Sequence, residues 1–246
     1  ELKTANNQLQ NDIEEKIQID EMRKEFIANV SHELKTPIAL IQGYAEGLRV
    51  GISDSEEAKN EYCDIIIDEA KRMNHLVRQL LDLSKIELGN TVPNKTAFDA
   101  YELAEAVVEK TQVMWQEKQL HVDVSGVGNE MLYADYDMLE RAVMNYMTNA
   151  IDHTPTGGHI RIQTAEDAKH IVLTVENEGS QLAQEEMDKI WDKFYKVDKA
   201  RTREYGGSGV GLSIVKAIMN SHNQKCGADN VENGVDFWFE LDCENA

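Results

Sequence analysis

The chain has 246 residues, of which 41% are hydrophobic and 28% charged, and its formal net charge is -20. This length accommodates one large domain or two modest ones with an ordinary core, and the composition is neither disordered nor fibrous. The strong negative charge argues against sequence-independent binding to nucleic acid or to an anionic membrane surface.

The three cysteines, Cys63, Cys226 and Cys243, lie far apart in the chain. Their spacing fits neither a disulfide framework nor a zinc site, and it indicates a reducing cytoplasm. No run approaches the roughly 18 apolar residues of a membrane helix, and no signal-peptide pattern opens the chain. Because the sequence lacks an initiator Met and begins on a helical pattern, we expect it to be a fragment of a longer protein.

Two long helices are predicted at the start of the chain. Residues 1–24 are polar with sparse apolar residues, as in a thin coiled coil that transmits a signal. Residues 25–90 carry two helical apolar stripes, separated by a turn in which Ser53 or Ser55 suits an N-cap. A helical hairpin buries little by itself, so we expect it to pair with a second copy in a four-helix bundle, as a homodimer.

The character of the sequence changes after residues 91–96, which are typical of a linker. Over 97–243, helical patterns alternate with strand patterns: helices at 101–118, 136–154 and 209–222, and strands at 119–126, 159–166, 170–179 and 234–242. Grouped strands with helices on one side predict an α/β two-layer sandwich rather than alternating βαβ units. The predicted fold class is therefore a helical hairpin followed by a two-layer sandwich.

His32 is the first candidate for chemistry. At about 100° per residue, His32 lies nearly opposite the centre of the apolar stripe, and Thr36 shares its outward face. Glu33 can accept the proton that the imidazole must lose if it acts as a nucleophile. Pro37 can kink the helix one turn later. A solvated helix face explains the same pattern, so the stripe alone leaves both interpretations open.

A pair of asparagines is the second candidate. Asn145 and Asn149 are four residues apart and therefore share one face of a predicted helix. Asparagine is a poor helix former, so the pair suggests two side-chain oxygens presented together. Neutral oxygens of this kind suit a hydrated Mg²⁺ that is held mainly by substrate phosphates. An ordinary polar helix face is the alternative.

A glycine-rich segment, "GGSGVGLSIV", opens the helix predicted at 209–222. Backbone amides at such a turn and helix start can form a phosphate cradle. The segment before it is basic in an otherwise acidic chain and is predicted to be a lid; its cations are Lys193, Lys196, Lys199, Arg201 and Arg203. A solvated loop would explain the charge but not the neighbouring glycines.

In this order, the segments resemble the sensor histidine kinases of bacterial two-component systems. "SHELKTP" is similar to the phosphoacceptor H-box, "NYMTNA" to the N-box, "NEGSQL" to the first glycine box, "WDKFYKVD" to the F-box and "GGSGVGLSIV" to the second glycine box. The resemblance covers residues from about 20 to 240. It implies a dimeric helical bundle that carries the histidine, followed by an ATP-binding sandwich of the GHKL (Bergerat) type, which gyrase and MutL share.

The resemblance also implies residue roles. His32 would be the phosphoacceptor, Glu33 its base, and Thr36 the residue that positions water when the partner regulator is dephosphorylated. Asn145 and Asn149 would hold Mg²⁺ and phosphates. The other ATP-binding positions would be His153, Asn177, Gly179, Lys196, Arg201, Arg203, Gly207, Gly209, Val210, Gly211 and Leu212.

Four positions depart from the family pattern, the mildest being Trp191 in place of a Phe. Asn177 stands where an adenine-reading Asp is usual, and its amide oxygen still accepts a hydrogen bond from the adenine amino group. Gln181 replaces a second glycine, which reduces backbone freedom. Asp152 occupies a position often held by a phosphate-binding Lys.

The expected function is ATP-dependent autophosphorylation of His32 with Mg²⁺, followed by phosphoryl transfer to an aspartate of a response regulator. The resemblance implies the cytoplasmic portion of a protein that is membrane-anchored through a segment outside this chain. Two alternatives stay open: a dimeric scaffold whose nucleotide pocket has decayed, and a GHKL ATPase that forms no phosphohistidine. The outward His32–Glu33 pair argues against the second, because ATP hydrolysis does not need it.

Overall fold

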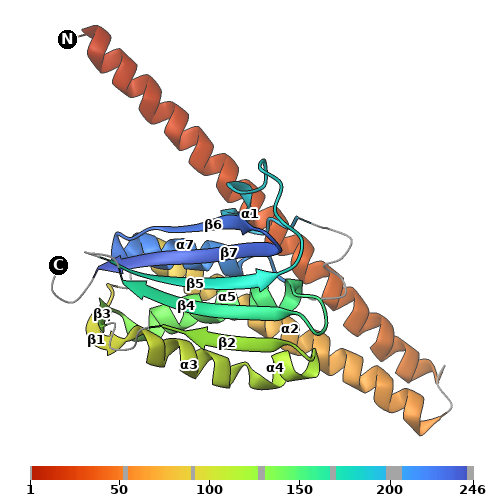
Figure 1. Cartoon of the computed structure of the whole chain (residues 1–246). Coiled ribbons are helices and arrows are strands. Elements are labelled where there is room, and N and C mark those ends of the chain that lie inside the picture. The colour runs from red at the N-terminus through yellow and green to blue at the C-terminus, as the bar shows by residue number, and fades with distance from the viewer. Residues whose placement is uncertain are drawn as a thin grey trace. The chain divides into compact units, whose positions relative to one another are not determined.

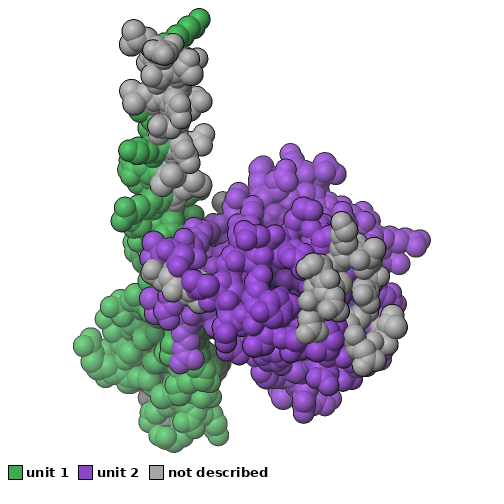
Figure 2. Space-filling model, turned by 90° about the vertical axis from the view of Figure 1, so that its left-hand side faces the viewer, with its two compact units in different colours: residues 1–77 green, residues 78–246 purple. Residues whose placement is uncertain are grey.

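The computed structural model describes residues 2–51, 55–89, 92–126, 131–166, 170–197 and 207–242. The chain divides into two compact units, residues 1–77 and residues 78–246, which Figure 2 colours separately. Helix α2 crosses this division, so its last turns belong with the second unit.

The first unit is a helical hairpin made of α1 (Leu2–Val50) and the greater part of α2 (Glu56–Glu87). Ser55 caps α2, because its Oγ accepts a hydrogen bond from the Ala58 N–H at 3.2 Å. Helix α1 continues through Pro37, so the distortion that the sequence allows there does not end the helix. Among the described residues, the helices contain no apolar segment long enough to cross a bilayer.

Two aromatic side chains hold the turn end of the hairpin together. The rings of Tyr44 and Tyr62 pack edge to face with their centroids 4.9 Å apart. Gly47 provides room for this contact, because a Cβ there would lie 2.9 Å from the Tyr62 ring. The two helices are therefore locked near their connection by an aromatic pair, which typically contributes about 0.5–1.5 kcal/mol beyond its buried area.

The second unit is a two-layer α/β sandwich. Its elements are, in chain order, β1 (Thr96–Asp99), α3 (Ala100–Lys110), α4 (Gln112–Glu117), β2 (His121–Ser125), β3 (Met131–Ala134), α5 (Tyr136–His153), β4 (His159–Glu166), β5 (His170–Glu178), the 3-10 helix η1 (Lys189–Trp191), α7 (Gly211–His222), β6 (Cys226–Val231) and β7 (Gly234–Asp242).

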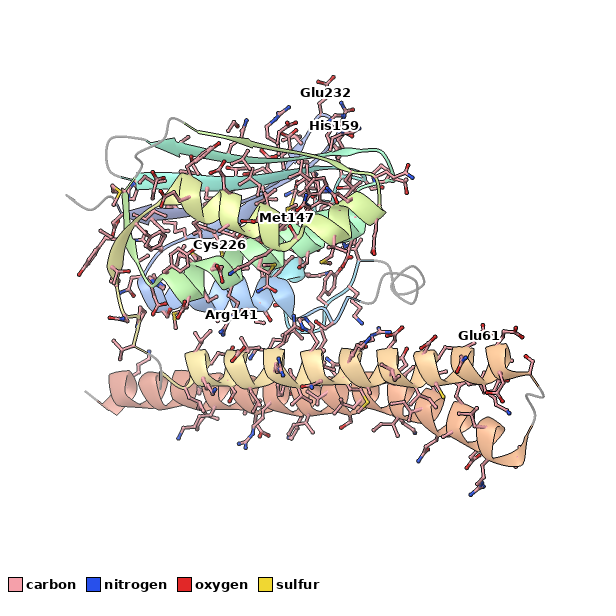
Figure 3. The ribbon with its side chains drawn as sticks, turned by 90° about the horizontal axis from the view of Figure 1, so that it is seen from below. Glu61, Arg141, Met147, His159, Cys226 and Glu232 are labelled. Atoms are coloured by element: carbon pink, nitrogen blue, oxygen red, sulfur yellow. The ribbon has the colours of Figure 1, made fainter. Side chains whose placement is uncertain are left out.

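The five-stranded sheet has the order β2-β4-β5-β7-β6, in which only the β2–β4 pair is parallel. Strands β1 and β3 form a separate antiparallel pair. Helices α3, α5 and α7 lie on one face of the large sheet (Figure 1), and in Figure 3 the labelled His159 and Glu232 mark the strand layer. The predicted two-layer sandwich is confirmed.

The core lies between the sheet and its helices. Along β5, buried and half-buried residues alternate, so Ile171, Leu173 and Val175 face the helices. Helix α5 supplies a buried apolar face that includes Leu139 and Tyr146. Fully burying a side chain of this size contributes about 1.5–3 kcal/mol, and this packing fixes the side of α5 that remains available for a ligand.

Two sequence-based predictions of secondary structure were wrong in detail. The single helix predicted over 101–118 is two helices, with Thr111 between them donating its hydroxyl to the Val107 carbonyl at 2.9 Å. Strands β1, β3 and β6 were not predicted, because β1 and β3 have only four residues each and β6 contains Gly, Asp and Asn. Strands β1 and β3 form by pairing with each other, and β6 by pairing with the longer β7, so pairing overrides these weak local preferences.

Candidate functional site

The predicted phosphoacceptor lies in the first unit, on α1. His32 and Thr36 are exposed, and Glu33 is half-buried. Residues four apart share a helix face, so the imidazole and the threonine hydroxyl point the same way. The hydroxyl of the neighbouring Ser31 donates to the Ile27 carbonyl at 2.8 Å and is used within the helix. His32 is thus open to a reactant, in keeping with the outward orientation that the apolar periodicity predicts.

Helix α5 positions the asparagine pair in the second unit. Its N-cap residue Asp135 accepts from the Met138 N–H at 3.1 Å. On the buried side, the Tyr146 hydroxyl donates to the Trp238 carbonyl of β7 at 3.0 Å, and burial raises the pKa of this phenol well above its usual value. The helix is therefore anchored through its core face and presents Asn145 and Asn149, both half-buried, on another side.

The first asparagine lies against the start of α7. A Cβ at Gly211 would lie 3.3 Å from Asn145 Oδ1, which places the amide beside the helix N-terminus. The Asn145 Nδ2 atom is buried and has no hydrogen-bond partner among the described residues. The first N–H groups of a helix have no intrahelical partner either. The predicted N-box and phosphate cradle, distant in sequence, thus form one polar surface.

Gly209 joins the cradle to the first part of the predicted lid. Its φ is +69°, a left-handed conformation that favours glycine, and a Cβ would lie 2.9 Å from backbone atoms of Phe194 and from the Tyr195 carbonyl. The Phe194 N–H donates to the Gly209 carbonyl at 2.8 Å. A side chain at position 209 would therefore separate the cradle from the first part of the predicted lid.

Asn177 ends the buried face of β5. It is 3% exposed and lies on the same face as Val175, toward the helices. Its Nδ2 donates to the Glu178 carbonyl at 3.3 Å, whereas Oδ1 is buried and has no partner within the described residues. A Cβ at Gly179 would lie 3.0 Å from the His153 carbonyl at the end of α5. These contacts bring the first glycine box to the N-box helix.

The segment after Asn177 is fastened to the β6–β7 hairpin. The Gly179 N–H donates to the Asn233 carbonyl at 2.9 Å, and Gln181 Nε2 donates to the Val231 carbonyl at 2.5 Å. The Asn230 amide both accepts from the Leu182 N–H and donates to its carbonyl, each at 2.8 Å. Gln181, at a position where the family usually has a glycine, thus helps to hold the segment after Asn177 against the β6–β7 hairpin.

The remaining predicted positions are distributed around these contacts. Lys196, Gly207 and Leu212 are half-buried, Val210 is fully buried at the N-cap of α7, and His153 is exposed. Arg201 and Arg203 lie outside the described residues. The structure therefore brings together the asparagine pair, both glycine boxes and the end of the F-box within the second unit, while His32, Glu33 and Thr36 belong to the first.

Comparison with known proteins identifies this pair of units. Residues 22–89 match the model of the His Kinase A (phospho-acceptor) domain, and residues 134–245 match the histidine kinase-, DNA gyrase B-, and HSP90-like ATPase model. The chain belongs to the sensor histidine kinases. Within this family, the exposed histidine lies in the phospho-acceptor domain and the asparagine and glycine motifs lie in the ATPase domain, as the sequence resemblance predicted.

Relatives of this histidine kinase are similar over nearly the whole chain. It is 31% identical over 236 residues to the sensor histidine kinase WalK of Bacillus subtilis, covering 94% of this chain and 38% of WalK. It is 34% identical over 204 residues to the sensor protein SrrB of Staphylococcus aureus, covering 83% of this chain and 35% of SrrB. The chain therefore spans little more than a third of the length of these curated relatives.

Solved histidine kinases have the same fold. The histidine kinase ThkA, in its complex with the response regulator protein TrrA, has a TM-score of 0.74 and 27% identity, covering 89% of this chain and 61% of that chain. The Acinetobacter baumannii histidine kinase AdeS has a TM-score of 0.73 at 23% identity, covering 87% and 98%. At this lower identity, AdeS supports the fold alone.

Asp152 is the departure from the family pattern with the clearest electrostatic consequence. Burial raises the pKa of its carboxyl to about 6, and the nearby Lys118 opposes this rise. Lys118 Nζ donates to the carbonyls of Ile151 and Asp152 at 2.6 and 2.9 Å, and so binds the C-terminal end of α5. A cation from the turn after α4 therefore partly compensates the carboxylate that replaces the usual lysine.

Sequence reasoning missed the contacts made by the last turns of α2 within the second unit. Ser208 Oγ, between two cradle glycines, donates to Gln79 Oε1 at 2.8 Å. Arg141 of α5 pairs with Asp82 at 3.1 Å, and Lys193 of the F-box pairs with Glu87 at 2.7 Å. Each pair is far apart in sequence and joins residues of ordinary surface type, so no local pattern could have indicated it.

Proposed function

We propose that this chain transfers the γ-phosphoryl group of ATP to His32 and then to an aspartate of a response regulator. The observation that carries the proposal is a pair of buried amide atoms, Asn145 Nδ2 and Asn177 Oδ1, that have no hydrogen-bond partner in the described part of the chain. Buried polar atoms are rarely left unsatisfied. Of the four such atoms in the matched ATPase domain, these two belong to the predicted ATP-binding motifs, and they fit a ligand that supplies both a hydrogen-bond acceptor and a donor.

ATP satisfies these two atoms from its opposite ends. The adenine amino group would donate to Asn177 Oδ1, with Gly179 and His153 close by, and the phosphates would accept from Asn145. Gly207, Gly209, Val210, Gly211 and Leu212 would supply the cradle at the start of α7. Lys196, Arg201 and Arg203 would approach the phosphates from the predicted lid, where cations offset the triphosphate charge.

Asn145 and Asn149 would also provide the protein ligands of Mg²⁺. Their neutral amide oxygens fit an ion that keeps most of its coordination for water and phosphate oxygens. Within the described residues, no group of three or more His, Cys, Asp and Glu side chains is placed to hold a metal ion. When bound, Mg²⁺ supplies positive charge that stabilises the transferring phosphoryl group.

His32 is the proposed nucleophile. The lone pair of one imidazole nitrogen forms a bond to the γ-phosphorus while the bond from that phosphorus to the β,γ-bridging oxygen breaks, and ADP leaves with the electron pair. The proton on the other ring nitrogen passes to Glu33, the adjacent carboxylate. The exposed surface of His32 leaves room for both the donor and, later, the receiver domain.

The phosphoryl group would then pass from His32 to an aspartate carboxylate of a response regulator. Thr36, on the same exposed face, would position the water that dephosphorylates that partner. We further propose that the chain works as a homodimer and as the cytoplasmic portion of a membrane-anchored parent. Its proposed boundaries are a signal-transmitting helix over 1–24, a phosphotransfer domain over 25–90, a linker over 91–96 and a catalytic domain over 97–243.

The proposal is tested by labelling the purified chain with γ-phosphate-labelled ATP and Mg²⁺. We expect His32→Gln to abolish acid-labile, base-stable labelling, while the matched variant His75→Gln, an exposed histidine on α2, keeps it. Full labelling of His32→Gln would overturn the assignment. A chain that binds no nucleotide would instead indicate the decayed scaffold, and ATP hydrolysis without any labelled histidine would indicate the simple ATPase.

A further inference from the structure

We propose that Asn177 makes this kinase accept 6-oxopurine nucleoside triphosphates, such as inosine triphosphate (ITP), as phosphoryl donors beside ATP. The inference rests on the proposed function, because it concerns the base end of the same nucleotide site. It assigns to one residue of this chain the choice of purine that the site binds.

The backbone of Asn177 is held too firmly to adapt to a different base. The residue pairs with Ile160 of β4 on one side and with Val235 of β7 on the other. Its carbonyl oxygen lies against Gly234, where a Cβ would overlap it. The strand therefore cannot shift along or across the sheet, and rotation of the side-chain amide is the adjustment left to this position.

The amide itself is held weakly. Its Nδ2 donates to the Glu178 carbonyl at 3.3 Å, beyond the usual range of about 2.7–3.2 Å for such bonds. Its Oδ1 is buried without a partner among the described residues. Exchange of the two atoms by a half-turn of the amide breaks one long hydrogen bond and turns Oδ1 toward the Glu178 carbonyl.

The two amide orientations match the two classes of purine. With Oδ1 toward the ligand, Asn177 accepts from the 6-amino group of adenine. With Nδ2 toward the ligand, it donates to the 6-oxo group of hypoxanthine. A carboxylate at this position has acceptors only and would face a 6-oxo group with like partial charge. An amide can therefore bind the 6-oxo group that a carboxylate repels. This difference originates in hydrogen-bond chemistry rather than in the size of the pocket.

The polar groups next to Asn177 in the described chain do not restore the discrimination between adenine and 6-oxopurines. The Gln181 amide is used on the Val231 carbonyl, and Glu178, on the opposite face of β5, accepts from the His159 N–H at 2.9 Å. The backbone N–H of Gly179 is bonded to the Asn233 carbonyl. Each of these groups of the described chain is bonded within the protein, and we infer that the orientation of the Asn177 amide decides which base is bound.

The test is the ratio of the dissociation constants of ITP and ATP, measured with Mg²⁺ on the whole chain. We expect the native chain to prefer ATP by less than about a hundredfold, since the amide flip breaks one weak bond and turns Oδ1 toward the Glu178 carbonyl. Asn177→Asp should raise the ratio above about a hundredfold, by weakening ITP binding and strengthening ATP binding. The matched change Asn220→Asp, at an exposed position of α7, should leave the ratio as it is.

A native ratio above a hundredfold, or the same ratio in Asn177→Asp and the native chain, would overturn this inference while leaving the proposed function intact. The native ratio decides the question even where the buried carboxylate of the variant hinders folding. Labelling of His32 by γ-labelled ITP is the second expected result. If neither triphosphate binds, the proposed function and this inference fail together.

Discussion

The two units of the chain differ in how completely they bury their large apolar side chains. In the helical hairpin, large apolar side chains remain in contact with solvent: Ile27 is 55% exposed, Ile38 41% and Ile67 49%. In the sandwich, Leu139 and Leu173 are 0% exposed. The sandwich therefore completes its own core, whereas the hairpin leaves an apolar surface that requires a partner, and a second copy of the hairpin is the partner we propose.

The largest expected effect comes from placing charge on the exposed apolar face of the hairpin. Ile38→Asp combined with Ile67→Asp should convert the proposed dimer to a monomer, because an unpaired buried charge costs about 3–5 kcal/mol, or more than a hundredfold in affinity. Light scattering measures the mass, and ATP binding by the sandwich should not change. Val113→Asp, at a 67% exposed apolar residue of the second unit, is the control; a dimer that survives the double change would show that this face is not the interface.

The complementary change empties the closed core of the sandwich. Leu173→Ala on β5 should lower the free energy of unfolding by about 2–5 kcal/mol, because the buried side chain leaves a cavity. Val92→Ala, at an 84% exposed residue, should change it by less than about 0.5 kcal/mol. Urea denaturation followed by circular dichroism gives both values. Similar losses in the two variants would contradict the contrast between a closed core and an open face.

Asp152 offers a smaller, pH-dependent effect within the sandwich. Its carboxyl has an ordinary pKa of 3.8 and a folded-state pKa of about 6, so on a rise in pH the unfolded state loses its proton first. The resulting loss of stability is absent below about pH 4, grows to about pH 6 and is complete above it, reaching at most about 3 kcal/mol. Asp152→Asn should therefore raise the unfolding free energy by about 1–3 kcal/mol at pH 7.5 and little at pH 4; an equal gain at both would exclude a charge effect.

The smallest expected effect concerns His222, which is 2% exposed. Its Nε2 accepts from the Asp135 N–H at 3.2 Å, its Nδ1 lies 2.9 Å from the Ile218 carbonyl, and burial lowers its pKa. As the pH decreases below the ordinary pKa of 6.5, the unfolded state binds the proton first. The unfolding free energy should therefore decrease by at most about 1.4 kcal/mol for each pH unit of acidification.

The opposing titration of Asp152 would mask this slope, so His222 is best studied in the Asp152→Asn background. There, His222→Asn should flatten the dependence of the unfolding free energy on pH between 6.5 and 5, whatever its effect on absolute stability. An unchanged slope in the double variant would assign the acid sensitivity to another group.

The sequence predicted the long, regular elements well and the short ones poorly. Strands β4 and β7 begin and end at the predicted residues, because their alternation of apolar and polar side chains is regular. Strand β6 was missed, since its Gly, Asp and Asn disfavour a strand until β7 pairs with it.

In the candidate site, too, some features could be predicted from the sequence and others could not. Motif spacing indicated Asn145, Asn177 and the cradle glycines, because each lies in a short recognisable segment. The contacts that assemble them could not be predicted, because the approach of Gly211 to Asn145 and of Gly179 to His153 depends on how α5, α7 and the sheet pack. Whether the amide atoms of Asn145 and Asn177 are satisfied is likewise a property of the folded unit alone.

Gly234 gives the base end of the site an uneven tolerance to mutation. Any side chain at this position would overlap the Asn177 carbonyl, so every replacement prevents the close pairing of β5 with β7. Asn177 itself can change its side chain without moving that pairing. In a library randomised at both positions, the variants that keep the close pairing of β5 with β7 should carry different residues at 177 but only glycine at 234. Descendants of this chain can thus acquire a new purine preference by single substitutions at 177, on a pair of interior strands whose close approach does not allow a side chain at 234.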